Sequence, residues 1–342
     1  MTQLNTGFTL FLSLLVEAIP FLLLGVLFSG VLLLFIDERQ LVAFMPRHPL
    51  LGAFVGSLVG FLFPVCECGN VPVARRLLMQ GVPAPVAIGF LLAAPTINPI
   101  VIWATWTAFR DQPEIVVLRV VLSLAIATII GWVFSVQADL RPMLHQLVAA
   151  NMPAPKRYTV KTSGFKSQDP TLALLQSGTF LLGKPGEAIR MDAPEFMASS
   201  GSITNKPMKD RLRLFLENTV QELRELGAVL VVGSAIAATL QVAVPREIIL
   251  SLGQDPITSI VAMMVLAAVV SICSTVDSFF ALSFASAFTS ASLLAFLVFG
   301  PMIDLKAIGL MLSIFKARAV FYLLALAAQL TFLFTLIYQI AY

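Results

Sequence analysis

Charge is scarce in this sequence: Asp, Glu, Lys and Arg together make up only 12% of its 342 residues. A soluble domain carries about 25% charged residues, so the composition excludes an ordinary water-soluble fold. Apolar residues reach 58%, and several continuous apolar runs approach the roughly 20 residues that a membrane-spanning helix needs. We therefore predict a polytopic membrane protein.

Segments of alternating hydrophobicity, which mark an outer-membrane barrel, are also absent. The continuous runs predict an all-α fold with about eight transmembrane segments, or alternatively ten. No basic residue precedes the first run, which predicts a retained helix and not a cleaved signal peptide. The apolar runs are Phe8–Ile36, Leu50–Phe63, Val82–Trp106, Ile115–Val136, Leu226–Val244, Ile257–Ile272, Ala281–Phe299 and Ala319–Tyr342.

Motifs for nucleotide binding and catalysis are missing as well. The sequence has no Walker A loop, no dinucleotide fingerprint and no catalytic triad arrangement, so we expect neither an enzyme nor ATP-driven pumping by this chain alone. Its two histidines, His48 and His145, lie in polar turns without metal-ligand spacing to the cysteines. We predict no metal, no cofactor and no nucleic-acid partner. The expected partners are the lipid bilayer and a small-molecule or metalloid solute.

A polar stretch separates two apolar halves. Residues 138–212 carry scattered Pro, Gly and Ser and many charges but only short apolar runs, which is typical of a partly disordered linker. Its excess of Lys and Arg indicates a cytoplasmic loop by the positive-inside rule. The flanking parts, 1–137 and 213–342, are the two expected transmembrane units.

The spacing of polar and helix-breaking residues recurs in these two units, which predicts an internal duplication. Four crossings in each unit would make the repeats parallel, whereas five would invert them. The matching sets are Glu17, Gly25, Cys66, Asn70, Pro95 and Asn98 in the first unit and Glu225, Gly233, Cys273, Asp277, Pro301 and Asp304 in the second.

The stretch Pro64–Pro99 is crowded with prolines, thiols, amides and arginines that hydrocarbon does not tolerate. Backbone freed by proline at membrane depth is viable only where protein or a water-filled cavity satisfies it. A pair of such interruptions, one in each half, points to a transport site. We therefore expect broken or re-entrant helices. The predicted break positions are Pro64, Gly69, Pro95, Pro99 and Pro301.

Two of the three cysteines, Cys66 and Cys68, are one residue apart. They share a side only if the chain is extended there, and Pro64 and Gly69 give a reason for such unwinding. Thiolates bind preferentially to soft centres such as trivalent arsenic. Two alternatives stay open: buried cysteine is a common small hydrophobe, and Cys66 with Cys68 would also suit a membrane thiol oxidoreductase.

Polar side chains beside the expected breaks are the remaining candidates for binding a small solute or ion. Asp277 is a proton-coupling candidate, although a residue before a helix commonly acts as an N-cap. Glu17 is a second proton-coupling candidate, because a carboxylate inside an apolar run should face protein or a cavity; the alternative is solvation near an interface. The candidate substrate-binding residues are Cys66, Cys68, Asn70, Thr96, Asn98, Cys273, Ser274, Thr275, Asp277 and Asp304.

Four motifs carry a family resemblance: P-V-C-E-C-G-N-V-P-V-A-R-R-L, L-L-A-A-P-T-I-N-P, S-T-V-D-S-F-F-A and G-P-M-I-D-L-K. With them the sequence resembles the predicted-permease family that includes the ArsP organoarsenical efflux permeases. The resemblance implies a permease of the bacterial inner (plasma) membrane and, in the ArsP branch, export of trivalent organoarsenicals and arsenic resistance. The positions it carries over are Cys66, Cys68, Asn70, Pro95, Asn98, Asp277, Pro301 and Asp304.

Overall fold

The structure is a computed structural model that describes residues 2–35, 46, 48–62, 66–136, 141–145, 148, 180–182, 188–190, 208–243, 255–285 and 287–341. The chain divides into two contact-defined units, one of Met1–Pro153 with Glu217–Tyr342 and one of Ala154–Leu216. In the second unit, strands β1 (Phe180–Leu182) and β2 (Ala188–Arg190) pair antiparallel. Most of the linker expected over 138–212 lies outside the described residues, so its disorder stays a prediction.

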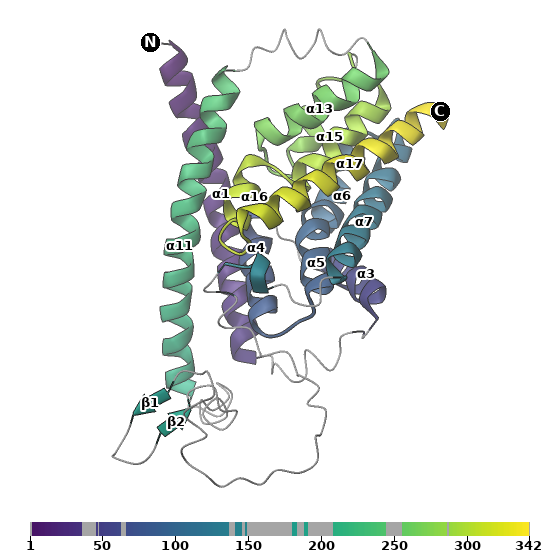
Figure 1. The fold of residues 1–342 in the computed structure, drawn as a ribbon. Coiled ribbons are helices and arrows are strands. Elements are labelled where there is room, and N and C mark those ends of the chain that lie inside the picture. The colour runs from purple at the N-terminus through teal and green to yellow at the C-terminus, as the bar shows by residue number, and fades with distance from the viewer. Residues whose placement is uncertain are drawn as a thin grey trace. The chain divides into compact units, whose positions relative to one another are not determined.

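The described part of the first unit is built from helices (Figure 1). Before the linker they are α1 (Thr2–Phe35), α3 (Pro49–Val59), the 3-10 turn η1 (Gly60–Leu62), α4 (Glu67–Met79), α5 (Ala84–Ile97), α6 (Pro99–Ala108), α7 (Pro113–Ser135) and the 3-10 turn η2 (Arg141–Met143). After it they are α11 (Met208–Ala243), α13 (Pro256–Val270), α14 (Asp277–Leu282), α15 (Ser290–Met302), α16 (Leu305–Met311) and α17 (Ala317–Ala341).

An all-α polytopic membrane fold is confirmed, with six candidate crossings and two shorter apolar helices in the described residues. The runs Leu50–Phe63 and Ile257–Ile272 appear as α3 and α13, of 11 and 15 residues, which fall short of the roughly 20 that span a bilayer. Six stretches in the described residues are long and apolar enough to cross: Asn5–Val31, Ala84–Ala108, Pro113–Ser135, Phe215–Val242, Ser290–Met311 and Ala317–Ala341.

Two of these six stretches are broken in their interior, each at a polar residue. Asn98 separates α5 from α6, and its Oδ1 accepts a hydrogen bond from the Ile100 N–H at 2.8 Å. Asp304 separates α15 from α16, and its Oδ1 accepts from the Ala307 N–H at 2.5 Å. Both side chains therefore cap the second half-helix and satisfy backbone donors that lipid cannot.

The prolines expected at these breaks lie beside them. Pro99 is the first residue of α6, where a missing N–H carries no penalty. Pro95 and Pro301 lie in the last turns of α5 and α15, just before the capping residues. Pro64 lies outside the described residues. A break at Gly69 was wrong, because α4 begins at Glu67 and runs through it.

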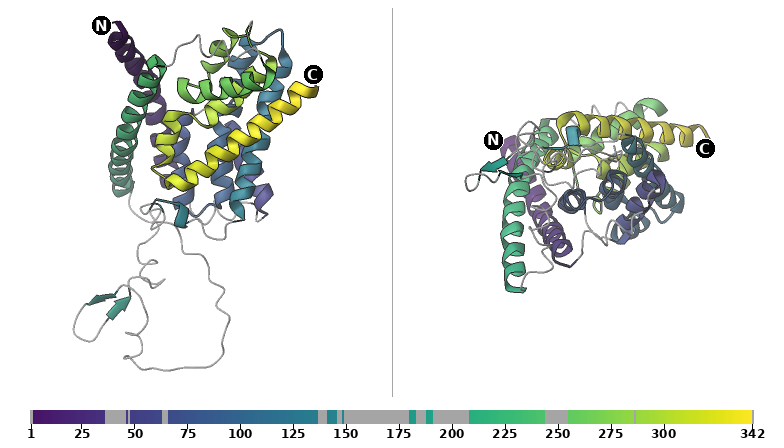
Figure 2. Two further views of the ribbon diagram at one scale, coloured as in Figure 1. Left: turned by 45° about the horizontal axis from the view of Figure 1, so that its top comes forward. Right: turned by 60° about the horizontal axis from the view of Figure 1, so that its bottom comes forward.

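The order of elements after α1 recurs after α11: a short apolar helix, a helix that starts at the polar motif, a broken helix and a long final helix. Helices α1 and α11 run antiparallel in both views (Figures 1 and 2), with Gly7 against Val242 and the Ser29 hydroxyl 3.2 Å from Glu222 Oε2. The cross-packing is reciprocal, because α4 packs on α16 and α14 on α6. Opposite directions of corresponding elements are typical of inverted repeats.

The centre of the unit is formed by the broken stretches. Nearly every side chain of α5 and α15 is buried, whereas α1, α7, α11 and α17 leave large apolar side chains exposed, such as Val16, Val121 and Ile340. In water such exposed residues would favour aggregation; in a bilayer they face lipid. Helices α5 and α15 are thus shielded from lipid, whereas α6 leaves Ile100, Trp103 and Trp106 exposed.

Close approach of backbones explains the glycine in the first turn of α4. A Cβ on Gly25 of α1 would overlap the carbonyl oxygen of Gly69, so the two helices touch through glycines. Small residues at helix contacts allow such packing in membranes.

We predict that Gly25→Val destabilises the protein, because overpacking costs about 1–3 kcal/mol. The measurement is the thermal unfolding midpoint in detergent. Gly227→Val is the matched control, since nothing lies within 4 Å of the added Cβ at that helical glycine. Equal midpoints for the two variants would contradict the α1–α4 contact.

Candidate functional site

The first part of the site is a group of two thiols and a carboxylate from opposite halves of the chain. Cys66 is the extended N-cap of α4, Glu67 is the first residue of that helix, and Cys273 lies between α13 and α14. Their ligand atoms (the two sulfurs and one carboxylate oxygen) all lie within 4.8 Å of one another, and all three residues are buried. Cys66 and Cys273 occupy matching positions in the expected repeats, so the two halves meet at their equivalent thiols.

Cys68 takes a different place from the one expected. The chain is extended at Cys66 but helical from Glu67 onwards, so Cys68 belongs to the first turn of α4. Cys68 is buried but is not a member of the three-residue group in the described residues. The partner that completes the pair from the other half is Cys273, and all three cysteines are free thiols.

The segment that carries Cys273 has an unusual backbone. Ser271 ends α13 in the left-handed region, with φ of 47°, a conformation that a non-glycine residue adopts at a cost of about 1–3 kcal/mol. Its hydroxyl accepts a hydrogen bond from the Leu305 N–H at 3.1 Å. This bond ties the end of α13 to the start of α16.

A buried ion pair lies beside the thiols. Lys306 Nζ of α16 is 3.7 Å from Glu67 Oε1 of α4, and the two side chains are 1% and 3% exposed. Glu67 Oε2 and Asp304 Oδ2 have no hydrogen-bond partner among the described residues. Sequence reasoning missed Lys306, although a lysine directly after a helix break in an apolar segment was a usable signal.

A second buried ion pair links the same two halves, but here the cation lies in the first half and the carboxylate in the second. Arg119 Nη2 of α7 lies 3.8 Å from Asp277 Oδ2, the first residue of α14. Arg119 Nη1 also donates to the hydroxyls of Thr105 and Ser278 at 2.8 and 2.9 Å, and Nη2 to the Ser274 carbonyl at 3.4 Å. The expected capping alternative for Asp277 was wrong, because Val276 is the N-cap residue of α14 and no side chain caps it.

Other expected polar residues are used within the fold. Asn70 Nδ2 of α4 donates to the Leu91 carbonyl of α5 at 2.6 Å. The Thr96 hydroxyl donates to the Ala93 carbonyl within α5 at 2.8 Å. The Thr275 hydroxyl lies 3.7 Å from the Cys273 sulfur. Asn70 Oδ1 has no hydrogen-bond partner among the described residues, so it is the atom of this group that stays available to a solute.

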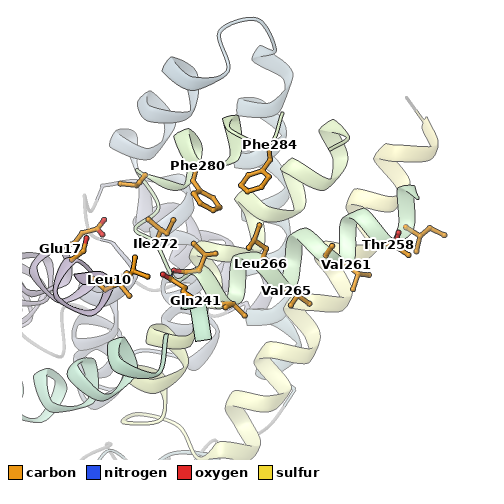
Figure 3. Close-up of a pocket in the computed structure, with 17 residues that line it drawn as sticks. Leu10, Glu17, Gln241, Thr258, Val261, Val265, Leu266, Ile272, Phe280 and Phe284 are labelled. Carbon is orange, nitrogen blue, oxygen red and sulfur yellow. Dashed lines mark hydrogen bonds between the residues drawn. The ribbon is translucent and has the colours of Figure 1, made fainter. Parts of the chain in front are cut away.

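An apolar cavity of about 880 Å³ adjoins the segment that carries Cys273. Residues of α1, α11, α13 and α14 line it, and Ile272 and Val276 on either side of the Cys273 segment form part of its wall. Figure 3 shows Glu17 at one end and Thr258 at the other. Glu17 therefore faces this cavity, and Gln241, the other large polar lining residue, donates to the Val270 carbonyl.

Comparison with known proteins shows the family of this chain. The family model ArsP_1, described as a predicted permease, matches residues 3–340. The chain belongs to this permease family. It is 37% identical over 322 residues to the UPF0718 protein YcgR of Bacillus subtilis (strain 168), covering 94% of this chain and 92% of that protein.

A second relative of the permease family is named as a putative two-component membrane permease complex subunit, from Streptococcus mutans serotype c (strain ATCC 700610 / UA159). It is 30% identical over 328 residues, covering 96% of this chain and 93% of the relative. No solved structure matches the chain.

We predict that Arg119→Leu destabilises this permease by about 3–5 kcal/mol, because it leaves the buried Asp277 carboxylate without its counter-charge. Adding Asp277→Asn to Arg119→Leu removes that charge and should recover most of the loss. The measurement is thermal unfolding in detergent.

The control is Arg75→Leu, which breaks a pair with Glu225 at 3.1 Å whose carboxylate side chain is 39% exposed. The Arg75 side chain is 11% exposed, so this partly solvated pair should contribute less to stability than the fully buried pair of Arg119 and Asp277. If the double variant were no more stable than Arg119→Leu alone, the unpaired Asp277 carboxylate would not be the cause of the destabilisation.

Proposed function

We propose that this permease exports a small thiophilic solute, in particular a trivalent organoarsenical, through the centre where the two halves meet. The observation that carries the proposal is the pair of Cys66 and Cys273, whose sulfurs lie within 4.8 Å of each other in a buried site. Thiol ligands select soft centres. The same pair lies where the N-terminus of α4 meets the segment between α13 and α14, and a centre between two repeats is the usual place of a transporter's substrate site.

The chemistry of the pair suits a monosubstituted trivalent arsenical. Each thiol displaces one hydroxyl from arsenic, so two As–S bonds form, two As–OH bonds break and two water molecules leave. Arsenic keeps its oxidation state, and the adduct carries no net charge. The reverse hydrolysis releases the solute. The neutral adduct fits a buried site, where an uncompensated charge would be costly.

The organic substituent has a place beside the thiols. The cavity of about 880 Å³ is lined mostly by apolar side chains and reaches Ile272 and Val276, which flank the Cys273 segment. An apolar group on arsenic is removed from water there, and burial of each CH₂ or CH₃ contributes about 0.8 kcal/mol.

The two expected repeats, 1–137 and 213–342, give a route for alternating access in this proposal. Movement of one half against the other would open the centre to one side of the bilayer and then to the other. We place the protein in the bacterial inner membrane with the loop of residues 138–212 in the cytoplasm, because Lys and Arg exceed Asp and Glu there.

Asp277 is the proposed proton-coupling group. Uptake of a proton by its carboxylate would end the ion pair with Arg119, while the Thr105 and Ser278 hydroxyls would still accept hydrogen bonds from the guanidinium. Arg119 links α7 to α14, so this change acts on a contact between the two halves. Glu17, in the cavity, is the second candidate.

We predict that proteoliposomes of the purified protein take up a methylated trivalent arsenical in preference to inorganic arsenite, and faster with a pH gradient. Cys66→Ser and Cys273→Ser should each lower the flux at least about tenfold, a loss of about 1.4 kcal/mol of transition-state stabilisation. Asp277→Asn should abolish the stimulation by protons.

A low-molecular-weight thiol and a neutral solute are the controls for leakage. No arsenical flux from folded protein, either in liposomes or in cells, would overturn the proposed substrate. Flux in cells but not in liposomes would point to a second component, as the name of the Streptococcus mutans relative implies for that protein. A Cys66–Cys68 disulfide trapped during turnover would favour the oxidoreductase alternative.

A further inference from the structure

We infer that Cys66, Glu67 and Cys273 form a binding site for a soft divalent metal ion of the Zn²⁺ and Cd²⁺ class. Two sulfurs and one carboxylate oxygen lie within 4.8 Å of one another. Two sulfurs on a tetrahedral ion, each about 2.3 Å from it, stand about 3.8 Å apart. Closing the group therefore takes side-chain movements of about 1 Å or less.

The carboxylate gives an independent indication of a ligand. Glu67 is 3% exposed, and its Oε2 has no hydrogen-bond partner among the described residues. A buried carboxylate oxygen without a partner is costly. An ion bound between the sulfurs and this oxygen would satisfy it.

The neighbouring ion pair does not have to break. Lys306 Nζ lies 3.7 Å from Glu67 Oε1, so Oε2 is the oxygen that remains for the metal. Two thiolates, one carboxylate and one ammonium carry a net charge of −2, to which the Asp304 carboxylate near Lys306 adds; a divalent ion offsets this negative charge, and each thiol gives up its proton as the ion binds. Lys306 thereby compensates the charge excess that a two-thiolate, one-carboxylate ligand set brings.

The number of ligands also points to an exchangeable ion. Structural zinc sites close the shell with four protein ligands, whereas three leave a position for water or another group. The group here has three members in the described residues, supplied by two halves of the chain. Binding would therefore draw the N-terminus of α4 and the 271–276 segment together.

This inference concerns binding alone and does not require that the ion be transported. It also differs chemically from the proposed arsenical adduct, which uses two sulfurs, forms covalent bonds and has no need of a carboxylate. Metal binding and arsenical flux can therefore be tested separately on one preparation.

The experiment is titration of the purified, reduced protein in detergent with Cd²⁺, followed by the ultraviolet thiolate-to-cadmium charge-transfer band and by equilibrium dialysis. We expect one Cd²⁺ per chain. Cys66→Ser and Cys273→Ser should each remove the paired-thiolate signal, and Glu67→Gln should weaken binding at least about tenfold while keeping the band. Zn²⁺ should compete, and Mg²⁺, which prefers oxygen ligands, should not.

Cys68→Ser is the matched control, because it removes a buried thiol of the same helix that is outside the group. It should keep the band and the stoichiometry. Loss of binding in Cys68→Ser as complete as in Cys273→Ser would overturn the ligand set, as would full binding by Glu67→Gln. Absence of Cd²⁺ binding in the folded wild type would overturn the site itself, whereas arsenical flux in that preparation would leave the proposed function intact.

Discussion

Every polar group at membrane depth must find its partner inside the protein, and the whole arrangement depends on this constraint. The breaks at Asn98 and Asp304 free backbone donors, and the same two side chains accept hydrogen bonds from the half-helices that follow. Buried charges are paired across the two halves of the chain, Glu67 with Lys306 and Arg119 with Asp277. The intact helices outside expose large apolar side chains toward lipid, and α7 directs Arg119 inward to Asp277.

What could be read from the sequence was local. The breaks near Pro99 and Pro301 were predictable, because a proline close to Asn or Asp within an apolar run is poorly compatible with an uninterrupted helix. The predicted break at Gly69 was wrong, since a glycine needed for close helix contact looks the same in sequence as a glycine that ends a helix. Helix lengths were less predictable for a related reason: an apolar run does not by itself reveal where its helix begins and ends.

The site was only partly predictable. Cys66, Cys68 and Cys273 were all expected candidates, but the sequence favoured Cys68 beside Cys66, whereas the three-residue group in the described residues joins Cys66 to Cys273. Lys306 and Arg119 were not recognised as members, because the carboxylate that pairs with each lies in the other half of the chain. Pairing between distant segments is decided by tertiary packing, and a single sequence carries little trace of it.

The cross-paired charges have a consequence for biosynthesis. The ribosome completes α7, with Arg119, long before it makes Asp277, so the first half enters the membrane with Arg119 and Glu67 lacking their counter-charges. Each such charge costs about 2.5–3.5 kcal/mol on insertion scales. The nascent first half is therefore an unstable intermediate that matures only when the second half arrives, and the order of translation becomes part of how this permease assembles.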